Sequence, residues 1–199
     1  MIIFIEGTRH SGKTYLLSKL IERHGEELGL FYYKFYLADE YSALVKDWDK
    51  SDKGIHYFSM GNIMTILDLH KKFPKMIFIF DRAHITATAW ATIWNRLTLT
   101  EAESELAGLV SRPGYEDCKI VFINTNDKFK QDSARKKDLW DGLVSSTSEF
   151  ELMHSLLDSA PKKIYDAELG NSISYFNNNF NEESVDLFCE LIRQLVQNK

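Results

Sequence analysis

The sequence predicts an α/β fold in three layers, α/β/α, with a parallel five-stranded sheet in the middle. Short apolar segments alternate with longer segments whose apolar residues recur at helical spacing, and a glycine-rich loop joins the first apolar segment to the first helix. Alternating strands and helices form parallel sheets that helices cover on both faces. Because 199 residues contain no internal repeat and no linker, we expect a single domain over 1–199.

The strands are predicted from short runs of β-branched, aliphatic and aromatic residues. Such runs lie at 2–6, 30–37, 76–81 and 119–123, with a weaker one at 163–166. Helical spacing predicts helices over 13–24, 59–72 and 85–96, one through Leu106 and Leu109, and one over 182–197. The first is expected to stop near Gly25, and Pro74 follows the second. Ligands of such sheets bind at the carboxyl ends of the strands.

The loop after the first strand has the spacing of a P-loop, or Walker A motif. Its residues are Gly7, Thr8, Arg9, His10, Ser11, Gly12, Lys13 and Thr14. Glycines let the backbone approach a phosphate closely, and the loop N–H groups then cradle its oxygens. Lys13 would supply charge to the outer phosphates, and the Thr14 hydroxyl would ligate Mg²⁺. The loop therefore predicts a P-loop NTPase fold with ATP and Mg²⁺ as cofactors; the alternative is a loop that keeps only the shape.

The third predicted strand ends in Asp81, and Arg82 follows at once. An Asp at the carboxyl end of a strand beside a P-loop can hold Mg²⁺ or its water. Asp81 could instead cap the next helix. The planar guanidinium of Arg82 suits a second phosphate or the transferred phosphoryl group, although a structural ion pair would also account for it.

Composition excludes several classes of protein. With a net charge of −5, the chain lacks the overall positive charge that is typical of proteins that bind duplex nucleic acids. No apolar run is long enough to span a membrane, and the first residues do not resemble a signal peptide. Cys118 and Cys189 are too few for a disulfide framework and suit a reduced compartment. We therefore expect a cytoplasmic protein without a membrane partner.

Two motifs resemble those of thymidylate kinases and deoxynucleoside kinases. They are Ile5-Glu6-Gly7 ahead of the P-loop, and Asp81-Arg82 ahead of a helix that contains Trp90. The stretch 56–94 resembles versions of this family found in bacteriophages. The resemblance implies an ATP-dependent kinase of nucleotide biosynthesis that phosphorylates a deoxynucleoside monophosphate or a deoxynucleoside. It also implies that Asp81 assists the metal and that Arg82 contacts the acceptor's phosphate or the moving phosphoryl.

The same resemblance implies a basic lid segment, here at about 126–140. Arg135 is the arginine in its basic stretch and would close over the γ-phosphate. Supporting candidates are Lys130, Lys136 and Lys137. The alternative is a solvated basic helix face. Arg9 and His10 in the P-loop are a second source of positive charge near the phosphates.

The acceptor site is less well defined by the sequence. The resemblance to deoxynucleoside kinases implies a general-base carboxylate near this point, where Asp39 or Glu40 would accept the proton of an acceptor hydroxyl. The alternative is that they cap a helix. Trp90 and Tyr57 are candidate walls for a nucleobase, with core packing as the alternative. The motif that follows the second strand of thymidylate kinases is absent, which leaves the acceptor open.

Two other functions fit the same residues. One is a P-loop kinase for another acceptor, such as a polynucleotide 5′ end or a small metabolite. The other is a non-catalytic ATP-binding switch. The apolar face at 63–69 would also permit a homodimer.

Overall fold

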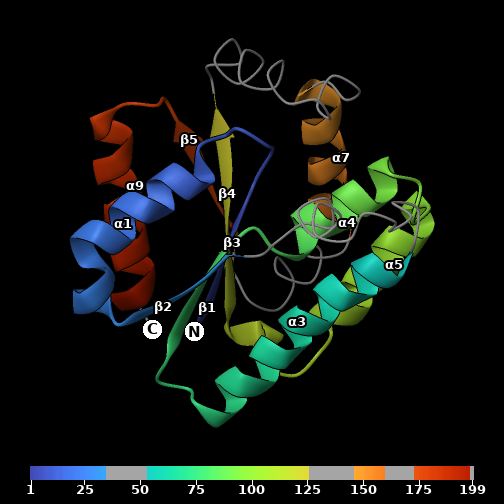
Figure 1. Ribbon diagram of the computed structural model, residues 1–199, viewed down its shortest axis with the longest axis horizontal. Coiled ribbons are helices and arrows are strands. Elements are labelled where there is room, and N and C mark those ends of the chain that lie inside the picture. The colour runs from blue at the N-terminus through green and yellow to red at the C-terminus, as the bar shows by residue number, and fades with distance from the viewer. Residues whose placement is uncertain (35–52, 126–145, 160–172, 198–199) are drawn as a thin grey trace, which may run out of the picture.

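Five parallel strands form one sheet in the order β2-β3-β1-β4-β5 (Figure 1). The computed structural model describes residues 1–34, 53–125, 146–159 and 173–197. The strands are β1 (Ile2–Glu6), β2 (Leu30–Lys34), β3 (Ile77–Asp81), β4 (Cys118–Thr125) and β5 (Ile173–Asn178). The helices are α1 (Lys13–Leu28), α3 (Lys53–Lys72), α4 (His84–Ile93), α5 (Leu99–Val110), α7 (Ser146–Ser159) and α9 (Glu182–Gln197), with a 3₁₀ turn at Tyr115–Asp117.

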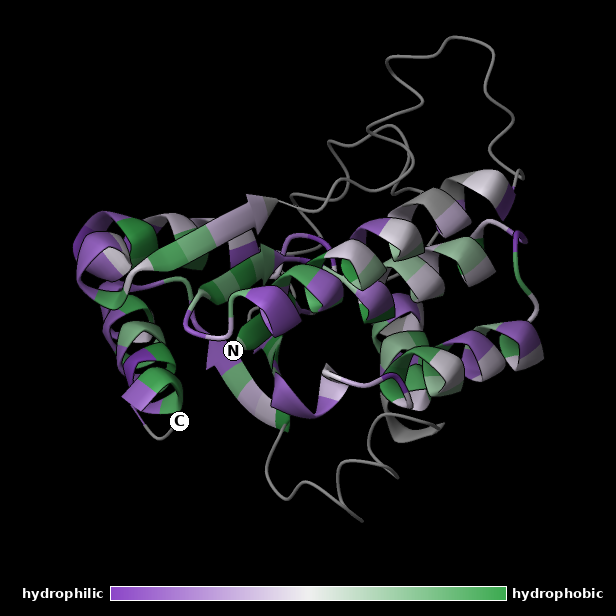
Figure 2. Cartoon of the chain, turned by 90° about the horizontal axis from the view of Figure 1, so that it is seen from below, coloured by the Kyte–Doolittle hydropathy of each residue, from purple (hydrophilic) through white to green (hydrophobic). Residues whose placement is uncertain are grey.

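Helices cover both faces of the sheet, which confirms the predicted three-layer α/β fold. On one face lie α1 and α9, and on the other lie α3, α4, α5 and α7 (Figure 1). The central strand β1 feeds both cores because successive side chains alternate. Ile3 and Ile5 pack with α1 and α9, whereas Ile2 and Phe4 pack on the opposite side. The helices accordingly carry both hydrophobic and hydrophilic residues (Figure 2).

Most predicted elements are present, with shifted ends. Helix α1 passes through Gly25 and ends at Gly29, whose φ of 60° closes the helix in the left-handed conformation. Helix α3 starts at Lys53 rather than at residue 59. Cys118 and Cys189 are buried and free, in a strand and a helix as expected. None of the described helices combines the length and the apolarity needed to cross a bilayer.

Two elements were not predicted, namely α7 and β5. The strand expected at 163–166 falls outside the described residues, and the fifth strand of the sheet is Ile173–Asn178. This strand lies at the edge of the sheet, and exposed residues such as Tyr175 alternate with buried ones such as Phe176. Its sequence therefore lacks the continuous apolar run by which buried strands are recognised.

Helix α9 offers a test of this packing. Ile192 is fully buried in the core between α1, α9 and the sheet, whereas Leu187 on the same helix is 57% exposed. We expect Ile192→Ala to lower the free energy of unfolding by about 2–5 kcal/mol and Leu187→Ala to lower it by less than about 0.5 kcal/mol. Urea denaturation of both variants measures the difference. Equal losses of free energy of unfolding would contradict the packing of Ile192, rather than Leu187, against the sheet.

Candidate functional site

The P-loop runs between β1 and α1 and is packed tightly between two strand ends. Gly7 has a φ of 136°, and a Cβ on it would lie 2.4 Å from the carbonyl oxygen of Ile123 in β4. Gly12 has a φ of 87°, and a Cβ there would lie 2.2 Å from Nδ2 of Asn178 at the end of β5. Both positions therefore require glycine for conformation and for space.

Lys13 lies at the first turn of α1, with its ammonium group folded over the loop. Its Nζ donates hydrogen bonds to the Gly7 carbonyl at 2.7 Å, to the Thr8 carbonyl and to Ser11 Oγ at 3.2 Å. The residue is only 4% exposed. Burial, followed by repulsion from the Arg82 guanidinium, lowers the pKa of Lys13 from 10.5 to about 7. Neighbouring carboxylates, Asp81 foremost, offset part of this shift.

Thr14 and Asp81 come together from α1 and the end of β3. Thr14 Oγ1 donates a hydrogen bond to Asp81 Oδ2 at 2.6 Å, and the Tyr32 hydroxyl donates to the same oxygen at 3.3 Å. The other carboxylate oxygen, Oδ1, is buried and has no hydrogen-bond partner among the described residues. A hydroxyl and a carboxylate with a spare oxygen fit Mg²⁺, which prefers oxygen ligands and shares them with phosphates and water. No cluster of at least three His, Cys, Asp or Glu side chains suggests another metal site in the described ranges.

Arg82 has an unusual backbone conformation. Its φ is 71°, in the left-handed region, and its N–H donates to the Ile5 carbonyl at 3.0 Å. A non-glycine residue in this region costs about 1–3 kcal/mol, and such residues cluster at functional sites. The turn brings the side chain to the wall of a cavity that Lys13 and Thr14 also line.

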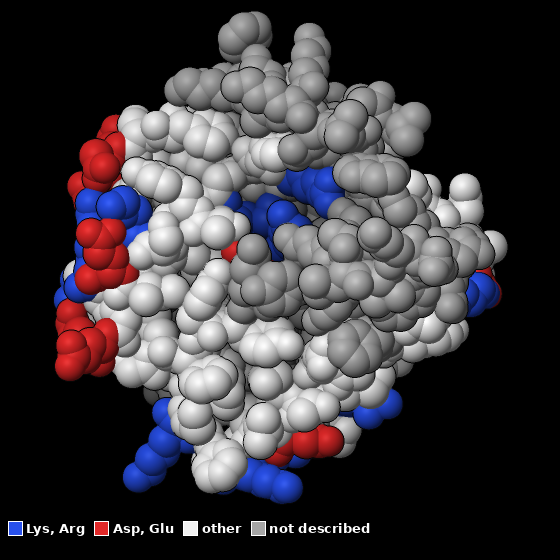
Figure 3. Space-filling model, viewed as in Figure 1, with Lys and Arg blue, Asp and Glu red and all other residues white. Residues whose placement is uncertain are grey.

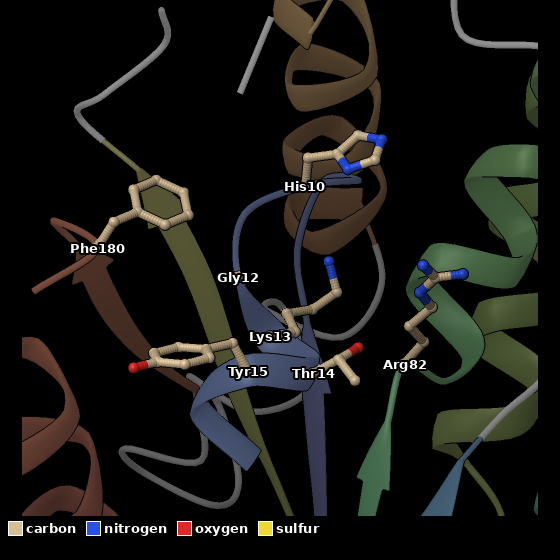
Figure 4. Close-up of a pocket in the computed structure, with 7 residues that line it drawn as sticks. All are labelled: His10, Gly12, Lys13, Thr14, Tyr15, Arg82 and Phe180. Carbon is tan, nitrogen blue, oxygen red and sulfur yellow. The ribbon is translucent and has the colours of Figure 1, made fainter. Parts of the chain in front are cut away.

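This cavity has a volume of about 310 Å³. Its lining residues are His10, Gly12, Lys13, Thr14, Tyr15, Arg82 and Phe180. The aromatic rings of Tyr15 and Phe180 lie on one side, and the Arg82 guanidinium lies on the other (Figure 4). Lys and Arg atoms also gather at a hollow in the surface (Figure 3). The site therefore offers cationic groups and flat apolar surfaces side by side.

Phe180 and Asn178 were missed by the sequence analysis because β5 was missed. Asn178 Nδ2 donates to the Ser11 carbonyl at 2.9 Å, and Asn178 Oδ1 accepts from the Phe180 N–H at 2.9 Å. One side chain thus ties the P-loop to the turn that carries Phe180. Phe180 itself has a φ of 57°.

Arg9 of the P-loop and Trp90 of α4 contact each other, and both contact a carboxylate that the sequence did not reveal. Trp90 is 2% exposed, and the Arg9 guanidinium carbon stands 4.4 Å from its ring centroid. Glu149 of α7 is fully buried; its Oε1 accepts from Trp90 Nε1 at 3.2 Å and from the Arg9 N–H at 3.1 Å. This burial favours core packing over nucleobase stacking for Trp90.

One further candidate is described by the structure, and the others are not. Tyr57 is 54% exposed on α3 and does not line it. Asp39, Glu40, Arg135 and the predicted lid over 126–140 lie outside the described residues. Their roles stay predictions.

Solved structures of two kinases, one for a nucleotide and one for a nucleoside, and of one further nucleotide-bound protein share this fold. A thymidylate kinase from Ehrlichia chaffeensis superposes with a TM-score of 0.60 at 12% identity, over 98% of this chain and 98% of that one. The YorR protein of Bacillus subtilis, solved with phosphorylated GDP, gives 0.56 at 16% identity, over 99% and 96% of the chains. A deoxyadenosine kinase from M. mycoides with bound dATP gives 0.55 at 14% identity, over 97% and 100%.

The chain shares the three-layer α/β fold of these solved structures. No family model matches the sequence, and no curated protein matches it either. At identities of 12–16% the solved structures establish the arrangement of strands and helices and nothing further.

The depressed pKa of Lys13 predicts a pH dependence of stability. Above about pH 7 the folded protein releases the Lys13 proton, whereas the unfolded chain keeps it up to about 10.5. The unfolded state therefore binds more protons in this window, and stability rises with pH by at most about 1.4 kcal/mol per pH unit. Lys13→Met should remove this rise, which urea denaturation at pH 7 and pH 9 measures.

Lys19→Met is the matched control, because Lys19 lies on the same helix, where it is exposed and pairs with Glu22. This variant should keep the rise between pH 7 and pH 9. Parallel pH profiles of the wild type and Lys13→Met would contradict the burial of the ammonium group.

Proposed function

We propose that the protein is an ATP-dependent phosphotransferase that moves the γ-phosphate of ATP to a deoxynucleoside or a deoxynucleoside monophosphate. The single observation that carries the proposal is the meeting of Lys13, Thr14 and Arg82 around one cavity, with Asp81 hydrogen-bonded to Thr14. The fold shared with solved nucleoside and nucleotide kinases supports it.

The donor binds on the P-loop side of the cavity. The loop N–H groups and the amino-terminal end of α1 face the triphosphate, an arrangement that stabilises anions. In this account the Lys13 ammonium leaves the carbonyls of Gly7 and Thr8 and bonds phosphate oxygens. An anion beside it favours the charged form, so binding raises the pKa of Lys13 again. The rings of Tyr15 and Phe180 provide apolar surfaces for the donor base.

Thr14 and Asp81 would hold Mg²⁺ in this account. Bound there, the ion would neutralise charge on the phosphate oxygens. Asp81 is suited to this task because it is 1% exposed and its Oδ1 is unpaired among the described atoms. A buried carboxylate of this kind is stabilised by a cation.

Arg82 acts on the acceptor side. Its guanidinium lies across the cavity from Tyr15 and Phe180 (Figure 4), where it can bind the acceptor's phosphate or the phosphoryl group in transit. Phosphoryl transfer needs in-line positioning and charge neutralisation more than covalent help from the protein. We propose Arg135 as a lid arginine and Asp39 or Glu40 as general base on the family resemblance alone.

Release of ADP in the presence of candidate acceptors tests the proposal. The assay covers the natural deoxynucleosides, their monophosphates and an oligonucleotide with a free 5′ hydroxyl. We expect at least one deoxynucleoside or monophosphate to raise turnover at least tenfold above the rate without acceptor. Stimulation by the oligonucleotide alone would point to the other kinase class, and slow turnover that no acceptor stimulates would point to a switch.

Replacing Arg82 separates binding from transfer. Arg82→Ala should lower kcat by at least about a hundredfold, the typical loss when one preorganised charge at the transition state is removed. The Kd for ATP should change by less than about threefold, because the P-loop contacts persist. Arg112→Ala is the control, since Arg112 is an exposed arginine beyond the end of α5. Unchanged acceptor kinetics in Arg82→Ala would eliminate this role.

A further inference from the structure

Glu6, the last residue of β1, is fully buried and directed at the start of α4. Its Oε1 accepts the Ile85 N–H at 2.8 Å, and its Oε2 accepts the Thr86 N–H at 3.1 Å and the Thr86 hydroxyl at 2.5 Å. Burial raises the pKa of Glu6 above its usual value, and these hydrogen bonds, with one from the Ala83 N–H, offset part of the rise. A carboxylate surrounded by donors at a helix amino terminus is favourably placed.

Helix α4 has no capping side chain of its own. The residue at its N-cap position is Ala83, and no side-chain hydrogen bond caps the helix from that position. The first N–H groups of any helix lack partners within the helix and need an acceptor from elsewhere. Glu6 supplies that acceptor from a different element, 79 residues earlier in the sequence than Ile85.

The turn that Glu6 fixes is the turn that carries Arg82. Ile5 accepts the Arg82 N–H at 3.0 Å, and the next residue of β1, Glu6, holds Ile85 and Thr86. Two consecutive residues of β1 therefore fix this turn: Ile5 binds Arg82 itself, and Glu6 binds the residues just after it. Its left-handed φ of 71° is costly and persists only where the surroundings impose it.

We propose that Glu6 is a positioning residue for phosphoryl transfer: by capping α4, it holds the turn that directs the Arg82 guanidinium into the phosphate cavity. The proposal rests on the proposed function and deepens it. Glu6 does not line the cavity, so it acts through Arg82. Because Gly7 follows Glu6 directly, the same strand end also starts the P-loop, and the two phosphate-binding segments share one anchor.

A double-mutant cycle tests whether Glu6 acts through Arg82. Glu6→Gln keeps the shape but places an NH₂ group against backbone donors. In the wild-type background we expect it to lower kcat at least tenfold while the Kd for ATP changes less than threefold. In the Arg82→Ala background it should lower kcat by no more than about twofold, because the side chain that it positions is gone.

Thr98→Ala is the matched control for the loss of a helix cap. Thr98 caps α5 in a capping box with Glu101, and it is not among the residues that line the cavity. This variant should lose stability but keep kcat within about twofold of the wild type. An equal fall in kcat for Glu6→Gln in both backgrounds, or no fall at all, would overturn the proposal.

A second variant and a structural measurement test the same role of Glu6. If Glu6→Gln does not fold, Thr86→Val removes one donor to the carboxylate and enters the same cycle, with an expected fall in kcat of about threefold. If the wild type transfers phosphate to no acceptor, the proposed function fails, and crystal structures of the wild type and Glu6→Gln, or Thr86→Val, decide the inference separately. The Arg82 guanidinium should leave the cavity in the variant; an unchanged Arg82 would refute the role of Glu6.

Discussion

The close approach of the P-loop to two strand ends is the constraint on which the site depends. Gly7 packs against the Ile123 carbonyl of β4, and Gly12 packs against Asn178 at the end of β5. Any side chain at either position would meet these atoms at distances below 3 Å. The loop therefore keeps its curvature only while β4 and β5 stay in place. Because β1 lies next to β3 in the sheet, Asp81 and Arg82 at the end of β3 lie at the same edge of the sheet as the P-loop that follows β1.

Buried charges around this loop are arranged in complementary groups. Lys13 and Arg82 line one cavity, and the buried carboxylates of Asp81, Glu6 and Glu149 interact electrostatically with Lys13. Glu6 and Glu149 accept hydrogen bonds from backbone N–H groups that need acceptors, whereas the buried Oδ1 of Asp81 has no partner within the described ranges. Glu6 and Glu149 therefore have hydrogen-bond donors of their own, and among these three carboxylates Asp81 is the one suited to the metal that we propose.

The sequence predicts the parts of the site that short-range patterns encode. The P-loop, the strand that ends in Asp81 and the helix after Arg82 each combine a motif with hydrophobic periodicity, and the structure has them at these positions. Glu149, Asn178 and Phe180 were not predictable in this way: Glu149 binds Arg9 across 140 positions, Asn178 binds Ser11 across 167, and Phe180 follows the strand that was missed. The edge strand β5 alternates polar and apolar residues, so its pattern is weak. The burial of Trp90 depends likewise on the tertiary contact with Glu149.

A crystal structure with a non-hydrolysable ATP analogue and Mg²⁺ tests the central claim most directly. The account predicts a triphosphate within the P-loop, the Lys13 ammonium moved from the Gly7 and Thr8 carbonyls to phosphate oxygens, and the metal beside Thr14 and Asp81. A triphosphate bound elsewhere, or a Lys13 still bonded to those carbonyls beside a bound nucleotide, would contradict it.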